Sequence, residues 1–207
     1  DLDFEVHGIS MDTLQDILLL AGVVRLVGKQ FGVLRIDGMD VDWSLPRRDS
    51  VGRKPIIEID PTMSIKDACR RRDVTMNAMM VDLRACMHAL AATSALENIV
   101  CEIIDPYNGL AAIAAGELRA VDSELFLDDP LRFFRIMQFI GRFNMVPDGE
   151  LTALCSSMAL ENIANERIFE ELSKLLLQSQ RPSVGIRWLL SIDRLDEIMP
   201  EVAALVG

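Results

Sequence analysis

The sequence has few of the side chains on which many metal and hydrolytic sites depend. Only two histidines occur, His7 and His88, which argues against a histidine-rich metal centre and against a Ser-His-Asp triad. The four cysteines are scattered and form no C-x-x-C pair, so we expect reduced thiols and no structural zinc. No apolar run reaches transmembrane length, and no signal peptide or lipidation motif is recognisable, which predicts a cytoplasmic protein without membrane contact.

Basic residues are also in the minority. The chain carries 21 Lys and Arg against 32 Asp and Glu, a net charge of −11. This argues against electrostatic binding of nucleic acid over a large part of the surface. Any RNA contact must therefore use local basic clusters or parts of a longer protein. Half of the 207 residues are hydrophobic, which allows a sizeable core in one large or two small domains and argues against disorder.

Acidic and apolar residues alternate in the first eight positions, which predicts a half-buried strand. On such a strand Asp1 and Asp3 point the same way, about 7 Å apart along the backbone. Two parallel carboxylates repel each other, and a hard cation such as Mg²⁺ between them relieves that repulsion. The alternative is an ordinary solvated strand edge.

A second alternating run, 39–45, places Asp40 and Asp42 on one face of a predicted strand. The strands and the hairpin turn that precede it are predicted at 23–27, 31–36 and Asp37-Gly38, after a helix that begins at Ser10. In one antiparallel or mixed sheet, Asp40 or Asp42 could converge with Asp1 and Asp3. The alternative is a solvent face with alternating acids.

A polar segment, 46–64, reads as a long loop and leads into a dense cluster of polar side chains. Three adjacent arginines at 70–72 are followed by Asp73 and Asn77. Arginine forks suit phosphate oxygens, and an amide at Asn77 could hold a sugar hydroxyl or a loop. The alternative is a solvated helix end.

The second half is predicted to be helical. Asp128-Asp129-Pro130 opens a helix with a buried stripe at Phe133, Ile136, Ile140 and Phe143, and Arg132 and Arg135 lie off that stripe. Asp129 and Arg132 are one helical turn apart, so they could form an ordinary ion pair. Further helices are predicted at 148–158, 166–178, 183–191 and 195–199.

Four stretches, in order, resemble the class II tRNA nucleotidyltransferases (CCA-adding enzymes) and the related bacterial poly(A) polymerases. Asp1-Leu2-Asp3 resembles their metal-binding D-x-D, and 71–78 is similar to R-R-D-F-T-I-N-A with Val74 where Phe is usual. Residues 128–132 resemble E-D-x-x-R with Asp for Glu, and 166–172 are similar to the E-R-I-x-x-E-L helix. The resemblance spans nearly the whole chain.

The resemblance implies an α+β fold. A polymerase-beta-like nucleotidyltransferase head is expected over 1–121, and a helical neck that recognises the base and RNA over 122–207. The implied reaction joins the 3′ end of tRNA to the α-phosphate of CTP or ATP and releases pyrophosphate. Two Mg²⁺ ions are expected on Asp1, Asp3 and a third carboxylate, for which we favour Asp42 over Asp40.

The remaining implied residues lie in the other three blocks. Arg72, Asp73 and Asn77 would position the ribose and triphosphate, and Asp129 and Arg132 would read the base. Arg135 would also bind the nucleotide. Glu166 and Arg167 would support them.

Two family segments are not recognisable, the glycine-rich stretch before D-x-D and the downstream tRNA-binding region. We therefore expect the chain to be the middle of a longer enzyme. Two alternatives stay open: a bacterial poly(A) polymerase, and a non-catalytic nucleotide-binding module. The arginine-rich signature of poly(A) polymerases is not found at 175–180, and the long segment 48–63 favours addition of the final A. No pattern indicates an oligomeric state.

Overall fold

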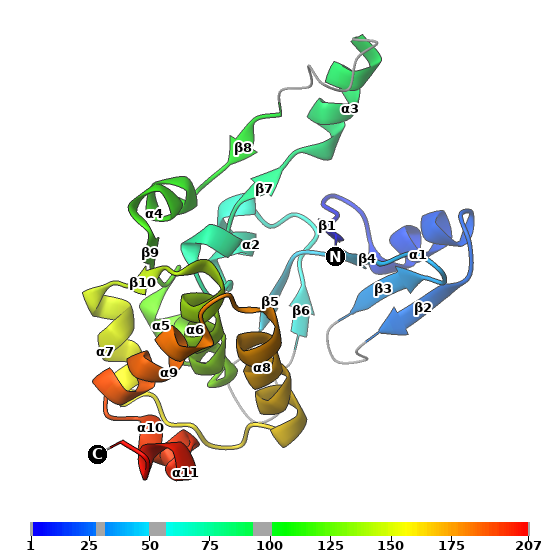
Figure 1. Ribbon diagram of the computed structural model, residues 1–207. Helices are drawn as coiled ribbons and strands as arrows, with labels where there is room; N and C mark the ends of the chain where they lie inside the picture. Colours follow the sequence, from blue (N-terminus) through cyan, green and yellow to red (C-terminus); the bar gives the residue numbers. More distant parts are fainter. Residues whose placement is uncertain (1, 28–31, 50–56, 93–100, 207) are drawn as a thin grey trace. The chain divides into compact units, whose positions relative to one another are not determined.

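The computed structural model describes residues 2–27, 32–49, 57–92 and 101–206 (Figure 1). The chain forms two compact units, Asp1–Arg71 and Arg72–Gly207. The domain boundary expected after residue 121 falls inside the second unit. Asp1 lies outside the described residues, as does the middle of the polar segment, 50–56.

The first unit is built on a four-stranded sheet of order β1-β4-β3-β2 (Figure 1). Its strands are β1 (Leu2–Glu5), β2 (Val24–Val27), β3 (Val33–Ile36) and β4 (Val41–Ser44). β1 runs parallel to β4, whereas β2, β3 and β4 are antiparallel, so the sheet is mixed. The parallel pairing is possible because the chain crosses over through α1 (Met11–Leu19) before it returns.

Capping and turn residues lie at the ends of these elements, at the positions that the sequence predicts. The Ser10 side chain accepts a hydrogen bond from the Thr13 amide at 3.1 Å and caps α1. Gly38, in the turn between β3 and β4, has a positive φ of 81°. Apolar side chains of α1, the sheet and the segment after it form a small core: Leu14, Leu18, Leu34, Ile36 and Leu45.

The polar segment is not loop throughout, which corrects the prediction. β5 (Arg47–Asp49) and β6 (Ile57–Ile59) form an antiparallel pair. α2 (Ile65–Arg70) follows, capped by Ser64, whose side chain accepts from the Asp67 amide at 3.1 Å. Each strand is only three residues long, too short for an alternating pattern to stand out in the sequence, which is why the two strands were not predicted.

The second unit begins with small elements, several of which have no clear signal in the sequence. They are η1 (Thr75–Asn77), β7 (Met80–Val81), α3 (Leu83–Ala92), β8 (Ile103–Ile104), α4 (Gly109–Ala115) and β9 (Glu117–Leu118). β7 pairs antiparallel with β8. This pairing brings the α3 region close to Cys101, and Cys86 and Cys101 form a disulfide with Cα atoms 5.4 Å apart. The prediction of four separate thiols is wrong for this pair.

Helices make up the rest of the second unit. They are α5 (Ser123–Phe126), α6 (Leu131–Phe143), α7 (Gly149–Ser157), α8 (Asn165–Gln178), α9 (Pro182–Ser191), α10 (Leu195–Ile198) and α11 (Pro200–Ala203); β10 (Val146–Pro147) pairs with β9. The predicted mixture of strands and helices, an α+β fold, is confirmed. No helix in the described part of the chain is long and apolar enough to cross a membrane.

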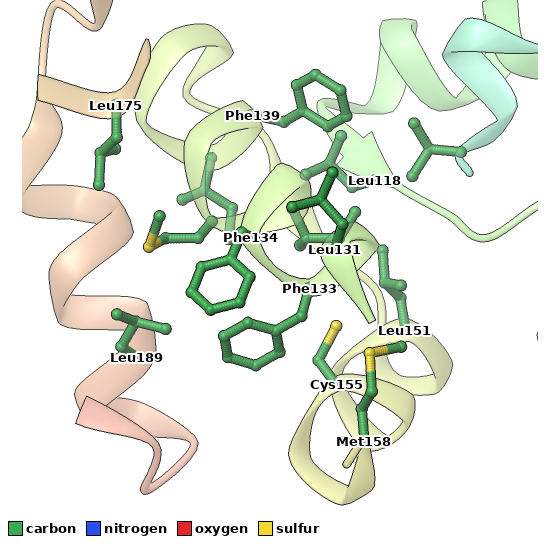
Figure 2. Close-up of a cluster of buried hydrophobic side chains, with 14 of the residues drawn as sticks. Leu118, Leu131, Phe133, Phe134, Phe139, Leu151, Cys155, Met158, Leu175 and Leu189 are labelled. Carbon is green, nitrogen blue, oxygen red and sulfur yellow. The ribbon is translucent and has the colours of Figure 1, made fainter. Parts of the chain in front are cut away.

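The core of the second unit surrounds α6, which packs against α8 and α9. Figure 2 shows Phe133, Phe134 and Phe139 of α6 among side chains from the neighbouring elements. Phe143, predicted to be buried, is 48% exposed. It is the last residue of α6, and Asn144 then ends the helix in the left-handed conformation, so the core no longer covers it.

Candidate active site

Two of the predicted metal-binding acids lie side by side in the first unit. Asp3 of β1 and Asp42 of β4 are register partners on adjacent parallel strands, so their side chains lie on the same face of the sheet. Asp3 is exposed and the Asp42 side chain is 33% exposed, so ions in solution can reach both. Asp40 precedes β4, and its side chain is 73% exposed.

A basic residue that sequence reasoning missed is bound to Asp42, one member of this pair. Arg35 of β3 lies opposite Asp42, and its Nε donates to Asp42 Oδ1 at 2.7 Å. The guanidinium offsets one of two neighbouring negative charges and orients the Asp42 carboxylate. The available signal was a cation at the centre of a strand between Leu34 and Ile36, which are both buried.

The donor set fits a hard divalent cation. Carboxylate oxygens are the ligands that Mg²⁺ prefers, and Asp42 already binds a cationic group. No cluster of three or more metal-ligating side chains forms among the described residues, and the predicted third member, Asp1, lies outside them. Asp3 and Asp42 could therefore supply two ligands of such a site, which would need further oxygens from substrate or water.

The same strand holds the start of the arginine-rich block. Glu5 of β1 has a side chain that is only 6% exposed, and Arg71 Nη2 donates to its Oε2 at 3.4 Å. His7 Nε2 lies 3.2 Å from Glu5 Oε1, and His7 Nδ1 lies 3.3 Å from the Met63 carbonyl oxygen. A buried carboxylate thus links the acidic strand to residue 71, which no sequence pattern indicated.

In the second unit, Asp73 is the centre of a buried polar network. Its Oδ1 accepts from the Val74 amide at 2.8 Å and from Asn77 Nδ2 at 3.0 Å, and its Oδ2 accepts from Arg135 Nε at 2.6 Å. Burial alone would raise the pKa of Asp73, but the charge of Arg135 and these hydrogen bonds outweigh it, so the pKa lies below its usual value. Asp73 therefore joins the arginine-rich block to α6.

Other parts of the block are held in the same way. Arg72 Nη1 donates to the Asn77 carbonyl oxygen at 3.1 Å. Val74, which stands where the family has Phe, is fully buried in the second core. The structure therefore brings Arg72, Asp73, Asn77 and Arg135 together.

Asp129 and Arg132 lie at the N-terminal end of α6, which begins at Leu131 rather than at Asp128. Asp129 Oδ1 accepts from the Leu131 amide at 3.1 Å, and its Oδ2 lies 3.5 Å from Arg167 Nη2. Arg132 Nη1 donates to the Leu125 carbonyl oxygen at 2.6 Å. Burial lowers the pKa of the Arg132 guanidinium, although neighbouring carboxylates act in the opposite direction.

Of the two predicted supporting residues, Arg167 contacts Asp129, whereas Glu166 is exposed in the first turn of α8. The buried acid of this helix is Glu171, which is 2% exposed and accepts from Lys174 Nζ at 2.6 Å. It belongs to the E-R-I-x-x-E-L block, but sequence reasoning did not select it because an acidic residue on a helix is usually solvated.

Comparison with known proteins connects this chain to RNA nucleotidyltransferases. Residues 151–205 match the family model described as "Probable RNA and SrmB- binding site of polymerase A". The chain is 31% identical over 218 residues to the Multifunctional CCA protein of Pseudomonas syringae pv. syringae, covering 100% of this chain and 48% of the relative. It is 34% identical over 200 residues to that of Laribacter hongkongensis, covering 88% and 43%. The chain thus spans about half the length of the curated relatives that it matches.

Solved structures share the fold. The Thermotoga maritima CCA-adding enzyme complexed with tRNA superposes with a TM-score of 0.70 at 22% identity, covering 97% of this chain and 44% of that one. A CCA-adding enzyme with ATP has a TM-score of 0.70 at 23% identity, with 97% and 43% coverage. With these relatives, the chain belongs to the family of class II CCA-adding tRNA nucleotidyltransferases and bacterial poly(A) polymerases.

Proposed function

We propose that the protein adds C and A residues from CTP and ATP to the 3′ end of tRNA, without a template, and releases pyrophosphate. The observation that carries this proposal is the register of Asp3 and Asp42, which sets two accessible carboxylates side by side in a chain related throughout to CCA proteins. A cytoplasmic location follows from this reaction, because its substrates are found there.

In the proposed reaction the RNA 3′-hydroxyl attacks the α-phosphate and pyrophosphate leaves in line. Asp3 and Asp42, with Asp1, would hold two Mg²⁺ ions, which when bound stabilise the attacking and leaving oxygens. Arg35 keeps the Asp42 carboxylate turned toward its face of the sheet. Arg72, Asn77 and Arg135, fixed around Asp73, would position the ribose and triphosphate.

Base choice would depend on Asp129 and Arg132. Cytosine and adenine share an exocyclic amine, which a carboxylate accepts from, next to a ring acceptor to which a guanidinium donates. Uracil and guanine present the opposite pattern at that edge, so they would leave polar groups unpaired. The contact between Asp129 and Arg167 supports this role, because it restrains the carboxylate without burying it.

A second candidate function is poly(A) addition, which the description of the matching family model favours. The curated relatives, which are named CCA proteins, favour CCA addition instead. A third alternative is a nucleotide-binding module without catalysis.

One experiment separates the three functions. The full-length protein is incubated with Mg²⁺, each labelled nucleotide and tRNA that lacks its 3′ CCA. Incorporation of C followed by A supports the proposal, and long A tracts on unrelated RNA would support poly(A) addition. If the folded full-length protein incorporates no nucleotide, the proposed activity is wrong.

A further inference from the structure

The second unit contains a hollow of about 630 Å³ at the C-terminal end of α6. Three segments line it: the η1 and α4–β9 region, the end of α6, and the link between α8 and α9. Its polar and aromatic lining includes Asn77, Arg142, Phe143, Asn144, Gln180 and Arg181. Arg132, at the other end of the helix, is ten residues from Arg142, which is about 15 Å at the α-helical rise. The hollow is therefore separate from the predicted base-reading pair.

We propose that this hollow binds a single-stranded segment of the RNA substrate, with phosphates on Arg142 and Arg181 and a base on Phe143. This inference depends on the proposed function for the identity of the RNA. It assigns an RNA-binding role to Arg142, Phe143 and Arg181, which the reaction itself does not use.

The two arginines are the first reason. Arg142 Nη1 donates to the neutral amide oxygen of Gln138 at 3.2 Å, and Arg181 is exposed beside Pro182 at the start of α9. Within the described residues, neither guanidinium forms an ion pair with a carboxylate. In a chain of net charge −11, two such cations facing one hollow form a local site for an anion.

Phe143 is the second reason. Its ring is 48% exposed, stacks on Phe139 with centroids 5.8 Å apart, and has the Arg142 guanidinium 5.1 Å from its centroid. An exposed aromatic ring held by neighbours is a platform on which a nucleic-acid base can stack. The amides of Asn144 and Gln180 add hydrogen-bonding groups at the edge of the hollow.

Together these features fit a phosphodiester chain better than a free nucleoside triphosphate. The cations come from two separate segments with an aromatic ring next to one of them, an arrangement that suits successive phosphates and a splayed base. Gln180 and Arg181 also lie within residues 151–205, the segment matched by the family model for a probable RNA-binding site. That match marks a segment without naming individual side chains, whereas the hollow points to Arg142, Phe143 and Arg181.

The test uses the full-length protein and tRNA that lacks its 3′ CCA. Binding is measured by fluorescence anisotropy across a salt series for the wild type, the double variant Arg142→Gln/Arg181→Gln and Phe143→Leu. The double variant should bind about tenfold more weakly. Its slope of log affinity against log salt should become shallower by about 1.4, since each phosphate contact contributes about 0.7. Phe143→Leu should weaken binding but leave the slope unchanged.

The matched control is Arg187→Gln, which removes an exposed arginine of α9 that does not line the hollow. It should leave the binding and slope as in the wild type, and Arg142→Lys/Arg181→Lys should restore the slope. The KM for RNA should rise in the double variant while the KM for CTP and the melting temperature stay constant. Unchanged RNA binding, an equal effect of Arg187→Gln, or a rise in the KM for CTP alone would overturn the inference. Absence of nucleotide addition by the wild type would refute the proposed function, and the anisotropy measurement would still test the hollow.

Discussion

The two units of this molecule place their charged groups in opposite environments. In the first unit Asp3 is exposed, Asp42 is a third exposed, and the core beneath the sheet is small. In the second unit Asp73 and Glu171 are 6% and 2% exposed, and both are hydrogen-bonded beside a much larger core.

The difference follows from what each site would have to bind. A carboxylate that holds an exchangeable ion must stay hydrated, because the free energy of desolvating it completely would exceed the free energy gained by binding the ion. A carboxylate that positions other side chains must itself be fixed, and burial together with hydrogen bonds to Asn77 and Arg135 fixes Asp73. We therefore expect substitutions in the first unit to affect chemistry and those around Asp73 to affect folding.

The largest effect should come from Asp3→Ala in the full-length protein. Loss of a metal ligand removes transition-state stabilisation of about 4 kcal/mol or more, so nucleotide addition should fall at least a thousandfold. The melting temperature should change little, because Asp3 is exposed. Asp16→Ala, an exposed acid on α1, is the control and should retain full activity. Near-normal incorporation by Asp3→Ala would contradict the metal-site assignment.

Asp73→Asn should have the next largest effect, and on stability. It leaves Arg135 beside a neutral partner in a buried network, a change that typically costs about 3 kcal/mol in the free energy of unfolding. Chemical denaturation measures this cost. The exposed pair of Asp129 and Arg167 offers the contrast, and Asp129→Asn should cost less than about 1 kcal/mol. Equal costs at the two positions would remove the distinction between the units.

The same Asp73 pair predicts how stability depends on pH. Because the folded-state pKa is lowered, the charged form stabilises the protein above the unfolded value, about 3.9, and this contribution is lost as the pH falls through the folded value. The stability difference between the wild type and Asp73→Asn should be constant near neutral pH and shrink below about pH 4. A difference that persists undiminished at pH 2 would exclude the ion pair as its source.

Arg132→Ala should change selectivity. Loss of one charged hydrogen bond to the base should lower kcat/KM for CTP and ATP by about ten- to a hundredfold and relax rejection of UTP and GTP. The measurement is kcat/KM for all four nucleotides on one tRNA, together with thermal melting, because Arg132 also donates to the Leu125 carbonyl. Lower stability with unchanged preference would mean that Arg132 only holds the start of α6.

The smallest expected effect is that of Arg35→Gln. Without the guanidinium, Asp3 and Asp42 repel each other more strongly and attract cations better. In EDTA, the melting temperature of Arg35→Gln should be lower than that of the wild type, and Mg²⁺ should restore it. Half-saturation of the variant with Mg²⁺ should need about fivefold less Mg²⁺ than that of the wild type, equivalent to about 1 kcal/mol of binding free energy. Arg25→Gln, in the exposed pair with Asp37, is the control. An unchanged or higher Mg²⁺ requirement would contradict a role for Arg35 at the acidic pair.

Local patterns in the sequence were sufficient for the four strands of the first sheet, for α1 and for the longer helices α6 to α9. Ser10 and Asp148 begin α1 and α7, and Asp37-Gly38 turns the chain between β3 and β4, because capping and turn geometry depend on a few adjacent residues. The mixed α+β class followed from the same short-range periodicities.

Contacts between distant segments had to come from the folded chain. The sequence could not show that Arg35 faces Asp42, that Asp73 binds Arg135 sixty-two residues away, or that Cys86 meets Cys101. The sequence pattern also predicted, wrongly, that Phe143 is buried. Its exposure depends on where the neighbouring helices stop covering α6. Each of these depends on strand register or helix packing, and a charged residue on an element looks the same in the sequence whether tertiary packing pairs it, buries it or leaves it in water.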